Sequence, residues 1–368
     1  MELDAVIRAL APGEVIGGRP VEILDLAYDT RRVAGGALFF CVPGASRDGH
    51  ELAGEAVAAG AAALVVERPV VADVPQLVVE SVRASMAVAA DTFFGNPTDR
   101  LTVAGVTGTN GKSTTAYLLH SILQAEDRST GLVGTVEWIV GGESRDAPHT
   151  TPEAIDLQSL FRDMLDAGDD AVVIEASSHG SHYRRLDRVR FDALVFTNLT
   201  QEHLDLHGDM EEYFQAKRRL FTGVTSPPAA VNIGDPYGRR LADELEAAHR
   251  APLVTFGLRP EAEVRAERLE LGPHGSTLTA AGMEIVTRLP GVFNVENVLG
   301  AVAAALLLDL DADAIVEGIG AVAGVAGRFE AIDEGQDFAV VVDYSHKPDA
   351  LAAVLRAARA LGDGRLTV

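Results

Sequence analysis

LTVAGVTGTNGKSTTAYLLHSILQA, residues 101–125, is the stretch around which the rest of the chain is organised. Its first six residues form an apolar run of strand length, and apolar residues recur at helical spacing after Lys112. Between them, residues 107–111 contain two glycines and an asparagine, which tolerate unusual backbone angles. The pattern predicts a strand, a glycine-rich loop and a helix, whose exposed N–H groups and positive N-terminus favour a bound phosphate.

The loop predicts a site for a nucleoside triphosphate. Lys112 is placed to reach the terminal phosphates, and the hydroxyl of Ser113 is a candidate magnesium ligand. The strict P-loop pattern requires a glycine six residues before the lysine, whereas Val106 stands there in this chain. A glycine-rich turn with a surface lysine is therefore the alternative interpretation. Lys-Ser-Thr at a helix start, directly after Gly-Thr-Asn-Gly, favours phosphate binding.

Composition is typical of a globular protein without a membrane or nucleic-acid partner. The 368 residues are 47% hydrophobic and 23% charged, which predicts two or three domains. The net charge of −23 argues against nucleic acid, because no broad basic surface can compensate its phosphates. We find neither a signal peptide nor an apolar run of ~20 residues. The single cysteine, Cys41, excludes a disulfide framework, and we expect a cytoplasmic protein.

Strands and helices alternate along the chain, which predicts an α/β fold. We expect an N-terminal α/β domain over residues 1–97, a central domain over 98–325 and a third domain over 326–368. The central domain should contain a mostly parallel sheet, because its strands are apolar on both faces. The third domain should be incomplete, since it contains one strand and one helix. The predicted strands of the central domain cover residues 101–106, 171–175, 193–197, 229–232 and 253–256.

Polar residues stand at the carboxyl ends of these strands, where ligands bind in parallel sheets. Glu175 ends a buried strand and is a candidate magnesium ligand, with an N-cap or salt-bridge acid as the alternative. His203 and His207 follow the next strand four residues apart, but no HExxH pattern or cysteine accompanies them. Zinc is therefore a weak interpretation. Lys217 lies in a predicted helix, and composition alone gives it no special role.

Six motifs, in this order, resemble those of the Mur ligase family, which are ATP-dependent amino-acid ligases of peptidoglycan synthesis. They are TGTNGKST (107–114), EASSHG (175–180), FTNLTQEHLDLHGDMEEYFQAK (196–217), FNVENVLGA (293–301), GRFE (327–330) and DYSHKPDAL (343–351). Within the family, the chain is similar to the branch that adds the third residue to UDP-N-acetylmuramoyl dipeptide. The stretches that carry this likeness are DTRRVAGGALFFCVPGASRDGH (29–50), HTTP (149–152) and SSHG (177–180), with Arg185 downstream.

The resemblance implies a UDP-binding N-terminal domain, an ATP-binding central domain and a Rossmann-like third domain. It implies that ATP, two magnesium ions, UDP-N-acetylmuramoyl dipeptide and an amino acid are bound by a monomer, and that the dipeptide's carboxylate is activated as an acyl phosphate. The implied catalytic residues are Lys112, Glu175, His203 and Lys217. The implied ATP-binding residues are Gly108, Thr109, Asn110, Gly111, Lys112, Ser113, Thr114, Asn294, Asn297, Arg328 and Asp343. The implied magnesium ligands are Ser113, Glu175, His203 and Lys217, the last as a carbamate. The implied residues for the UDP-muramoyl peptide are Thr30, Thr150, Thr151, Ser177 and Arg185.

The chain departs from the family pattern in several places. Glu202 precedes the metal histidine where the family has Asp, Tyr183 stands where Gln or Leu is common, and Ser345 replaces an Ala. The family's third domain continues further and carries an Asp-Asn-Pro-Arg motif for diaminopimelate, which this sequence lacks. We therefore expect either a fragment or a naturally short chain. Whether it adds diaminopimelate or lysine, and whether it is active alone, stay open.

Three alternatives remain at the level of sequence. A folylpolyglutamate synthetase belongs to the same superfamily, but it carries Gly-Lys-Gly-Ser in the loop where this chain has Gly-Lys-Ser-Thr. A shortened, non-catalytic homologue would bind nucleotide or UDP-sugar without ligating. A regulatory NTPase would hydrolyse nucleotide without the sugar substrate.

Overall fold

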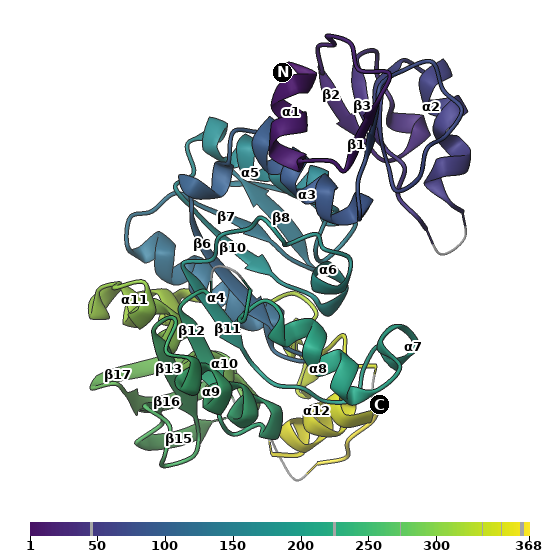
Figure 1. Cartoon of the computed structure of the whole chain (residues 1–368). Coiled ribbons are helices and arrows are strands. Elements are labelled where there is room, and N and C mark those ends of the chain that lie inside the picture. The colour runs from purple at the N-terminus through teal and green to yellow at the C-terminus, as the bar shows by residue number, and fades with distance from the viewer. Residues whose placement is uncertain (45–46, 224–225, 273, 333, 347, 361–363) are drawn as a thin grey trace. The chain divides into compact units, whose positions relative to one another are not determined.

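Figure 1 shows a computed structural model of the chain, in which contacts group the residues into two compact units. Unit 1 comprises Met1–Arg100, Pro152–Asp163 and His182–Val189, and unit 2 comprises Leu101–Thr151, Met164–Ser181 and Arg190–Val368. The structure describes residues 1–44, 47–223, 226–272, 274–332, 334–346, 348–360 and 364–368. Residues 45 and 46 of the stretch 29–50 therefore lie outside the described residues. The division into three domains stays a prediction.

Unit 1 is built on a five-stranded sheet with the order β1-β5-β4-β3-β2, in which only the β1–β5 pair is antiparallel. Its strands are β1 (Glu14–Ile16), β2 (Asp25–Ala27), β3 (Ala37–Phe40), β4 (Ala61–Val66) and β5 (Gln76–Val78). Its helices are α1 (Leu3–Leu10), α2 (Ala53–Ala58) and α3 (Val82–Phe93). All four residues of β3 are buried, because apolar side chains cover both faces of the sheet. Cys41, directly after β3, is buried as a free thiol.

Unit 2 contains a nine-stranded sheet with the order β14-β13-β12-β11-β6-β10-β7-β8-β9. The strands from β14 to β7 are parallel, and β8 and β9 extend the sheet as antiparallel strands. They are β6 (Thr102–Thr107), β7 (Thr130–Val133), β8 (Glu137–Val140), β9 (Glu143–Asp146), β10 (Ala171–Glu175), β11 (Ala193–Phe196), β12 (Ala229–Asn232), β13 (Leu253–Gly257) and β14 (Val264–Arg265). The mostly parallel sheet predicted from buried apolar runs is confirmed, and β6 lies near its centre.

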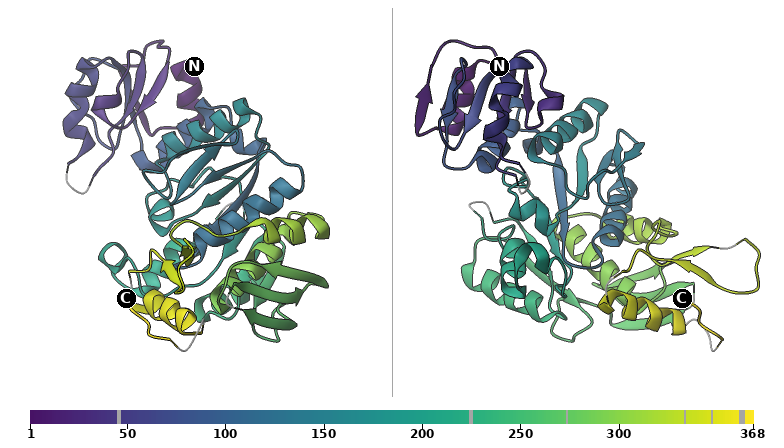
Figure 2. Two further views of the ribbon diagram at one scale, coloured as in Figure 1. Left: turned by 180° about the vertical axis from the view of Figure 1, so that it is seen from behind. Right: turned by 90° about the vertical axis from the view of Figure 1, so that its right-hand side faces the viewer.

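Helices cover both faces of this sheet, as Figure 2 shows from two further sides. On β11, Val195 joins the cluster formed with α4 and α10, whereas Leu194 and Phe196 join the cluster formed with α8 and α9. The helices are α4 (Lys112–Ala125), α6 (Ser178–His182), α7 (Leu204–His207), α8 (Met210–Arg218), α9 (Pro236–Ala248), α10 (Val292–Leu307) and α11 (Ala312–Ala321). Helix α5 (Ala154–Ala167) begins in unit 1 and ends in unit 2.

Two smaller sheets complete unit 2. An antiparallel sheet of β15 (Arg268–Gly272), β16 (Gly275–Ala280) and β17 (Met283–Thr287) packs through Leu278 and Ile285 on the core of α4 and α10. A hairpin of β18 (Glu330–Ile332) and β19 (Val340–Val342) is followed by α12 (Pro348–Ala360). Helix α11 ends at Ala321 and β18 begins at Glu330, so residues 322–329 between them belong to no helix or strand. Among the described residues, no helix has the length and apolar character needed to cross a bilayer.

The helix that follows the phosphate loop is held by an unusually close contact with α11. A Cβ atom on Gly318 would lie 2.4 Å from Ile122 Cα and 2.8 Å from Ser121 O. The hydroxyl of Ser121 also donates a 2.7 Å hydrogen bond to Gly318 O. Because backbone faces backbone here, the contact cannot yield as a flexible side chain would.

We expect Gly318→Ala to lower the free energy of unfolding by about 1–3 kcal/mol, because the added methyl overpacks this contact. Gly320→Ala, in the same helix, is the matched control, since its Cβ would meet nothing closer than Val286 O at 3.6 Å. The control should gain up to ~1 kcal/mol in helix propensity. Urea titration of both variants measures the difference, and equal stabilities would contradict the packing argument.

Candidate active site

The register of the sheet brings together the carboxyl ends of three strands that precede predicted site residues. Glu175 pairs with Val106 across β10 and β6, and Phe196 pairs with Thr107 across β11 and β6. These three neighbouring strands therefore end together, and the loops that follow them share one rim. The phosphate loop, the carboxylate of Glu175 and the segment after β11 meet there, as strand-end reasoning predicts.

The phosphate loop needs glycine at two positions. Gly108 has a φ of +146°, and a Cβ there would lie 1.9 Å from Thr197 Oγ1. Gly111 has a φ of +85°, and a Cβ there would lie 2.2 Å from Asn297 Oδ1. Side chains at these positions would collide with the neighbouring segments as well as strain the backbone. The loop conformation thus follows from the glycines of the sequence, although Val106 breaks the strict pattern.

Polar residues after β11 fix the loop from the side. Thr197 Oγ1 donates to Asn110 O at 2.6 Å, and Asn198 Oδ1 accepts from Asn110 N at 2.9 Å. Thr109 Oγ1 accepts from Thr200 N at 3.0 Å and lies 3.1 Å from Tyr213 Oη. These hydrogen bonds hold the loop against the segment that follows β11.

Lys112 begins α4 and folds back over the loop. Its Nζ donates to Thr109 O at 2.8 Å and to Gly108 O at 3.1 Å. Burial lowers the pKa of Lys112, while the negative charges of Glu175 and Glu202 oppose that shift. Two carbonyl oxygens of the loop are thus the hydrogen-bond partners of the Lys112 ammonium group.

Lys217, from α8, reaches the same carbonyl. Its side chain is only 1% exposed, and its Nζ donates to Gly108 O at 2.8 Å and lies 4.9 Å from the centre of the Tyr213 ring. Burial, followed by the positive charge of Lys112, holds the pKa of Lys217 well below its usual range, with Glu202 opposing. Burial at this position thus disfavours the charged form of the amine.

Glu175 and His203 lie close enough to this pair of lysines for their charges to interact. Glu175 is 1% exposed, and both of its carboxylate oxygens accept hydrogen bonds from Thr135. His203 caps α7 with a left-handed φ of +54°, and its ring lies 4.6 Å from that of His179. Burial lowers the pKa of His203, and the charges of Lys112 and Lys217 act in the same direction, against Glu202.

Of the predicted nucleotide residues outside the loop, Asn297 and Arg328 contact the loop or the start of α4, whereas Asp343 bonds to residues near it in the chain. On α10, Asn297 Nδ2 donates to Asn294 Oδ1 at 3.0 Å, and Asn297 lies against Gly111. Arg328 Nη2 donates to Ser113 Oγ at 3.1 Å. Thr114 is buried within α4. Asp343 is engaged locally, because its two oxygens accept from Phe329 N and Ser345 N at 2.7 Å each.

The predicted substrate residues fall in both units. In unit 2, Thr151 Oγ1 donates to Glu175 O at 2.7 Å, and Thr150 Oγ1 lies 3.1 Å from Thr135 Oγ1. Ser177 Oγ accepts from Gly180 N at 3.0 Å. In unit 1, Thr30 opens a 3₁₀ turn (Thr30–Arg32) that follows Asp29. Arg185 pairs with Glu153 at 2.7 Å, and its guanidinium lies 5.5 Å from the centre of the Tyr183 ring.

The oxygen atoms of Glu175 and Ser113 are chemically suited to bind magnesium. Within the part of the chain that the structure describes, no three His, Cys, Asp or Glu side chains form a metal-binding group. A site for magnesium would instead combine Glu175 with hydroxyl oxygens, which are ligands that magnesium prefers. The guanidinium of Arg328 already acts as a cation at Ser113 Oγ, so a lone pair of this buried hydroxyl faces positive charge.

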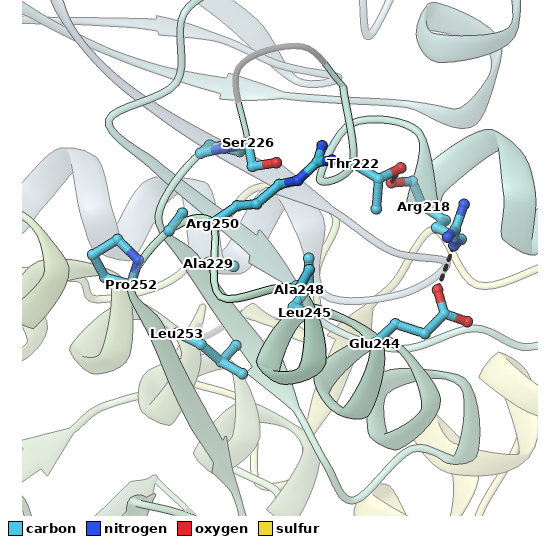
Figure 3. Close-up of a pocket in the computed structure, with 12 residues that line it drawn as sticks. Arg218, Thr222, Ser226, Ala229, Glu244, Leu245, Ala248, Arg250, Pro252 and Leu253 are labelled. Carbon is cyan, nitrogen blue, oxygen red and sulfur yellow. Dashed lines mark hydrogen bonds and ion pairs between the residues drawn. The ribbon is translucent and has the colours of Figure 1, made fainter.

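A separate cavity of about 400 Å³ lies at the amino ends of β12 and β13, opposite the carboxyl ends described above (Figure 3). Ala229 and Leu253, the first residues of β12 and β13, line it together with Arg218, Glu244 and Arg250. Arg218 is held by an ion pair with Glu244. Among the predicted site residues, none lines this cavity.

Comparison with known proteins agrees with this geometry. Residues 22–93 match the model "Mur ligase family, catalytic domain", residues 106–305 match "Mur ligase middle domain", and residues 327–368 match "Mur ligase, glutamate ligase domain". The UDP-N-acetylmuramoyl-L-alanyl-D-glutamate–2,6-diaminopimelate ligase of Geobacillus kaustophilus is 44% identical over 362 residues, covering 94% of this chain and 72% of the relative. The ligase of that name from Streptomyces coelicolor is also 44% identical, over 357 residues, with coverages of 94% and 70%.

A solved structure of a UDP-N-acetylmuramoyl-L-alanyl-D-glutamate–2,6-diaminopimelate ligase has the same fold. Its TM-score with this chain is 0.80 at 28% identity, and the match covers 93% of this chain and 70% of that one. Sequence and structure therefore agree over most of the chain, including the phosphate loop and the strand ends around it. This chain belongs to the Mur ligase family of ligase enzymes.

Proposed function

We propose that this chain takes part in the ATP-dependent addition of 2,6-diaminopimelate to the D-glutamate of UDP-N-acetylmuramoyl-L-alanyl-D-glutamate. The observation that carries the proposal is the shared rim where Lys112, Lys217 and Glu175 surround the phosphate loop. Relatives at 44% identity bear the name of this ligase, which supports diaminopimelate over lysine as the added amino acid.

ATP would bind with its phosphates on the N–H groups of residues 108–113. Lys112 Nζ would leave its two carbonyl partners and hold the β- and γ-phosphates. Asn294 and Asn297 would border the nucleotide, and Arg328 would exchange Ser113 for a phosphate oxygen. Magnesium, held by Ser113 and Glu175 and at a second position by His203 and Lys217, would neutralise charge on the phosphates.

The chemistry would proceed in two balanced steps. A carboxylate oxygen of the D-glutamyl side chain attacks the γ-phosphorus, the bond to the β-phosphate oxygen breaks, and ADP leaves. The amine of the incoming amino acid then attacks the acyl carbon, loses a proton and expels phosphate. The protein contributes positioning and charge stabilisation rather than a covalent intermediate of its own.

We also propose that Lys217 acts as a carbamate. Its buried side chain favours the neutral amine, which is the form that adds to the carbon of CO₂ and releases a proton to solvent. The product is a carboxylate-like pair of oxygens at the end of a long side chain. Such oxygens are magnesium ligands, whereas the unmodified amine at this position is not.

A non-catalytic binding homologue and a folylpolyglutamate synthetase remain the rival functions. The match of residues 22–93 to a Mur ligase model favours a Mur substrate over folate. The rivals differ in what ADP formation requires. A binding module forms no ADP, and a regulatory NTPase forms ADP without the UDP-linked acceptor.

For the wild-type chain, we expect ADP formation that depends on UDP-N-acetylmuramoyl-L-alanyl-D-glutamate. Lys112→Ala should lower its rate by roughly 10²–10³, because a charge contact to the transferred phosphoryl group is lost. Arg250→Ala, which removes a basic side chain at the opposite edge of the sheet, is the control and should keep its rate. Acceptor-independent ADP formation, or near-normal release by Lys112→Ala, would refute the proposed function.

The carbamate can be tested directly because the chain contains three lysines, at positions 112, 217 and 347. After incubation with ¹³C-bicarbonate, we expect one carbamate carbon signal in the NMR spectrum of the wild-type chain. Lys217→Met should remove that signal, and Lys347→Arg should keep it. A signal that survives Lys217→Met places the modification elsewhere, and a wild-type chain without any signal excludes it.

A further inference from the structure

Thr135, which sequence reasoning passed over, holds the carboxylate of Glu175 with two groups of one residue. Its backbone N donates to Glu175 Oε1 at 2.8 Å, and its Oγ1 donates to Glu175 Oε2 at 3.0 Å. It sits two residues beyond the end of β7, which pairs with β10 up to Val133 and Ile174. Gly134 makes the approach possible, because a Cβ there would lie 2.7 Å from Glu175 Oε1.

The same hydroxyl also contacts a predicted acceptor-side residue. Thr135 Oγ1 lies 3.1 Å from Thr150 Oγ1, and either atom could in principle be the donor. Each hydroxyl has one proton, and that of Thr135 is already donated to Glu175. Thr150 must therefore donate to Thr135, which completes a one-way chain from Thr150 through Thr135 to Glu175.

The hydroxyl of the neighbouring Thr151 makes its hydrogen bonds within the protein. Its Oγ1 donates to Glu175 O at 2.7 Å and accepts from Ser177 N at 3.1 Å, and the side chain is 1% exposed. The two threonines thus bracket Glu175, one at its backbone and one through its carboxylate. Because Thr151 is buried and Thr150 is partly exposed, Thr150 is the one of the pair whose oxygen can accept a hydrogen bond from a ligand.

From this chain we propose that Thr135 is a positioning residue, which fixes the carboxylate of Glu175 for magnesium and orients the Thr150 hydroxyl toward the acceptor. The inference rests on the proposed function. Because the hydroxyl proton of Thr150 points at Thr135, the hydroxyl oxygen of Thr150 can only accept a hydrogen bond from the bound dipeptide. The group it suits is an N–H donor, such as the amide between the two residues of the dipeptide, rather than a carboxylate.

Thr135→Val tests the positioning role, because valine keeps the branched shape and the backbone N–H and removes only the hydroxyl. Calorimetry measures ADP affinity with magnesium and with EDTA. In the wild-type chain, magnesium should raise the affinity for ADP. In Thr135→Val, we expect this increase to be roughly 10–100-fold smaller, as for other partners of metal ligands, whereas ADP affinity in EDTA should be unchanged. Thr135→Ser restores the hydroxyl and should restore the gain.

A double-variant cycle with Thr150→Val tests the link to the acceptor. Each single variant should weaken binding of UDP-N-acetylmuramoyl-L-alanyl-D-glutamate, and the double variant should weaken it by less than the product of the two effects, because both break one chain. A Thr135→Val chain that keeps the full magnesium gain, or additive effects in the cycle, would overturn the inference. A wild-type chain with no magnesium gain at all would instead overturn the proposed function.

Discussion

The carbonyl oxygen of Gly108 accepts hydrogen bonds from the side chains of both Lys112 and Lys217. This shared contact brings two basic groups together in a buried place, and their mutual repulsion adds to the cost of burying charge. The loop can present that carbonyl because Gly108 adopts a backbone angle and a closeness to Thr197 that a side chain would forbid. The contact of Lys112 with the loop and the lowered pKa of Lys217 both depend on this geometry.

Much of the fold could be predicted from local pattern. The strands at 171–175 and 229–232 lie at the predicted residues, and β6, the loop and α4 follow as expected, because buried parallel strands are continuous apolar runs. The antiparallel strands β9 and β15 were not predicted. Their residues are mostly exposed, so their sequences carry no apolar run, and their pairing is decided by neighbouring strands instead.

The site was predictable where chemistry is local and unpredictable where it depends on contact across the sheet. Lys112 and Ser113 follow from one loop, but Thr135 is an ordinary residue until β7 and β10 set it beside Glu175. For Lys217, composition offers a signal besides the motif that ends at this residue. Only three of the 31 basic residues are lysines, and the rest are arginines, which do not give up a proton when buried. A lysine that is only 1% exposed in a chain so poor in lysine therefore marks this position as a candidate for chemistry that arginine cannot perform.

The central claim is that the phosphoryl group passes to the acceptor's carboxylate at this rim. The direct measurement uses UDP-N-acetylmuramoyl-L-alanyl-D-glutamate with ¹⁸O in the side-chain carboxylate of D-glutamate and analyses the phosphate released in the ATP-dependent reaction. Formation and breakdown of an acyl phosphate move one carboxylate oxygen to phosphorus, so the phosphate should carry one ¹⁸O atom and appear two mass units heavier. Released phosphate without ¹⁸O would show that ATP is hydrolysed by water, which would contradict the account.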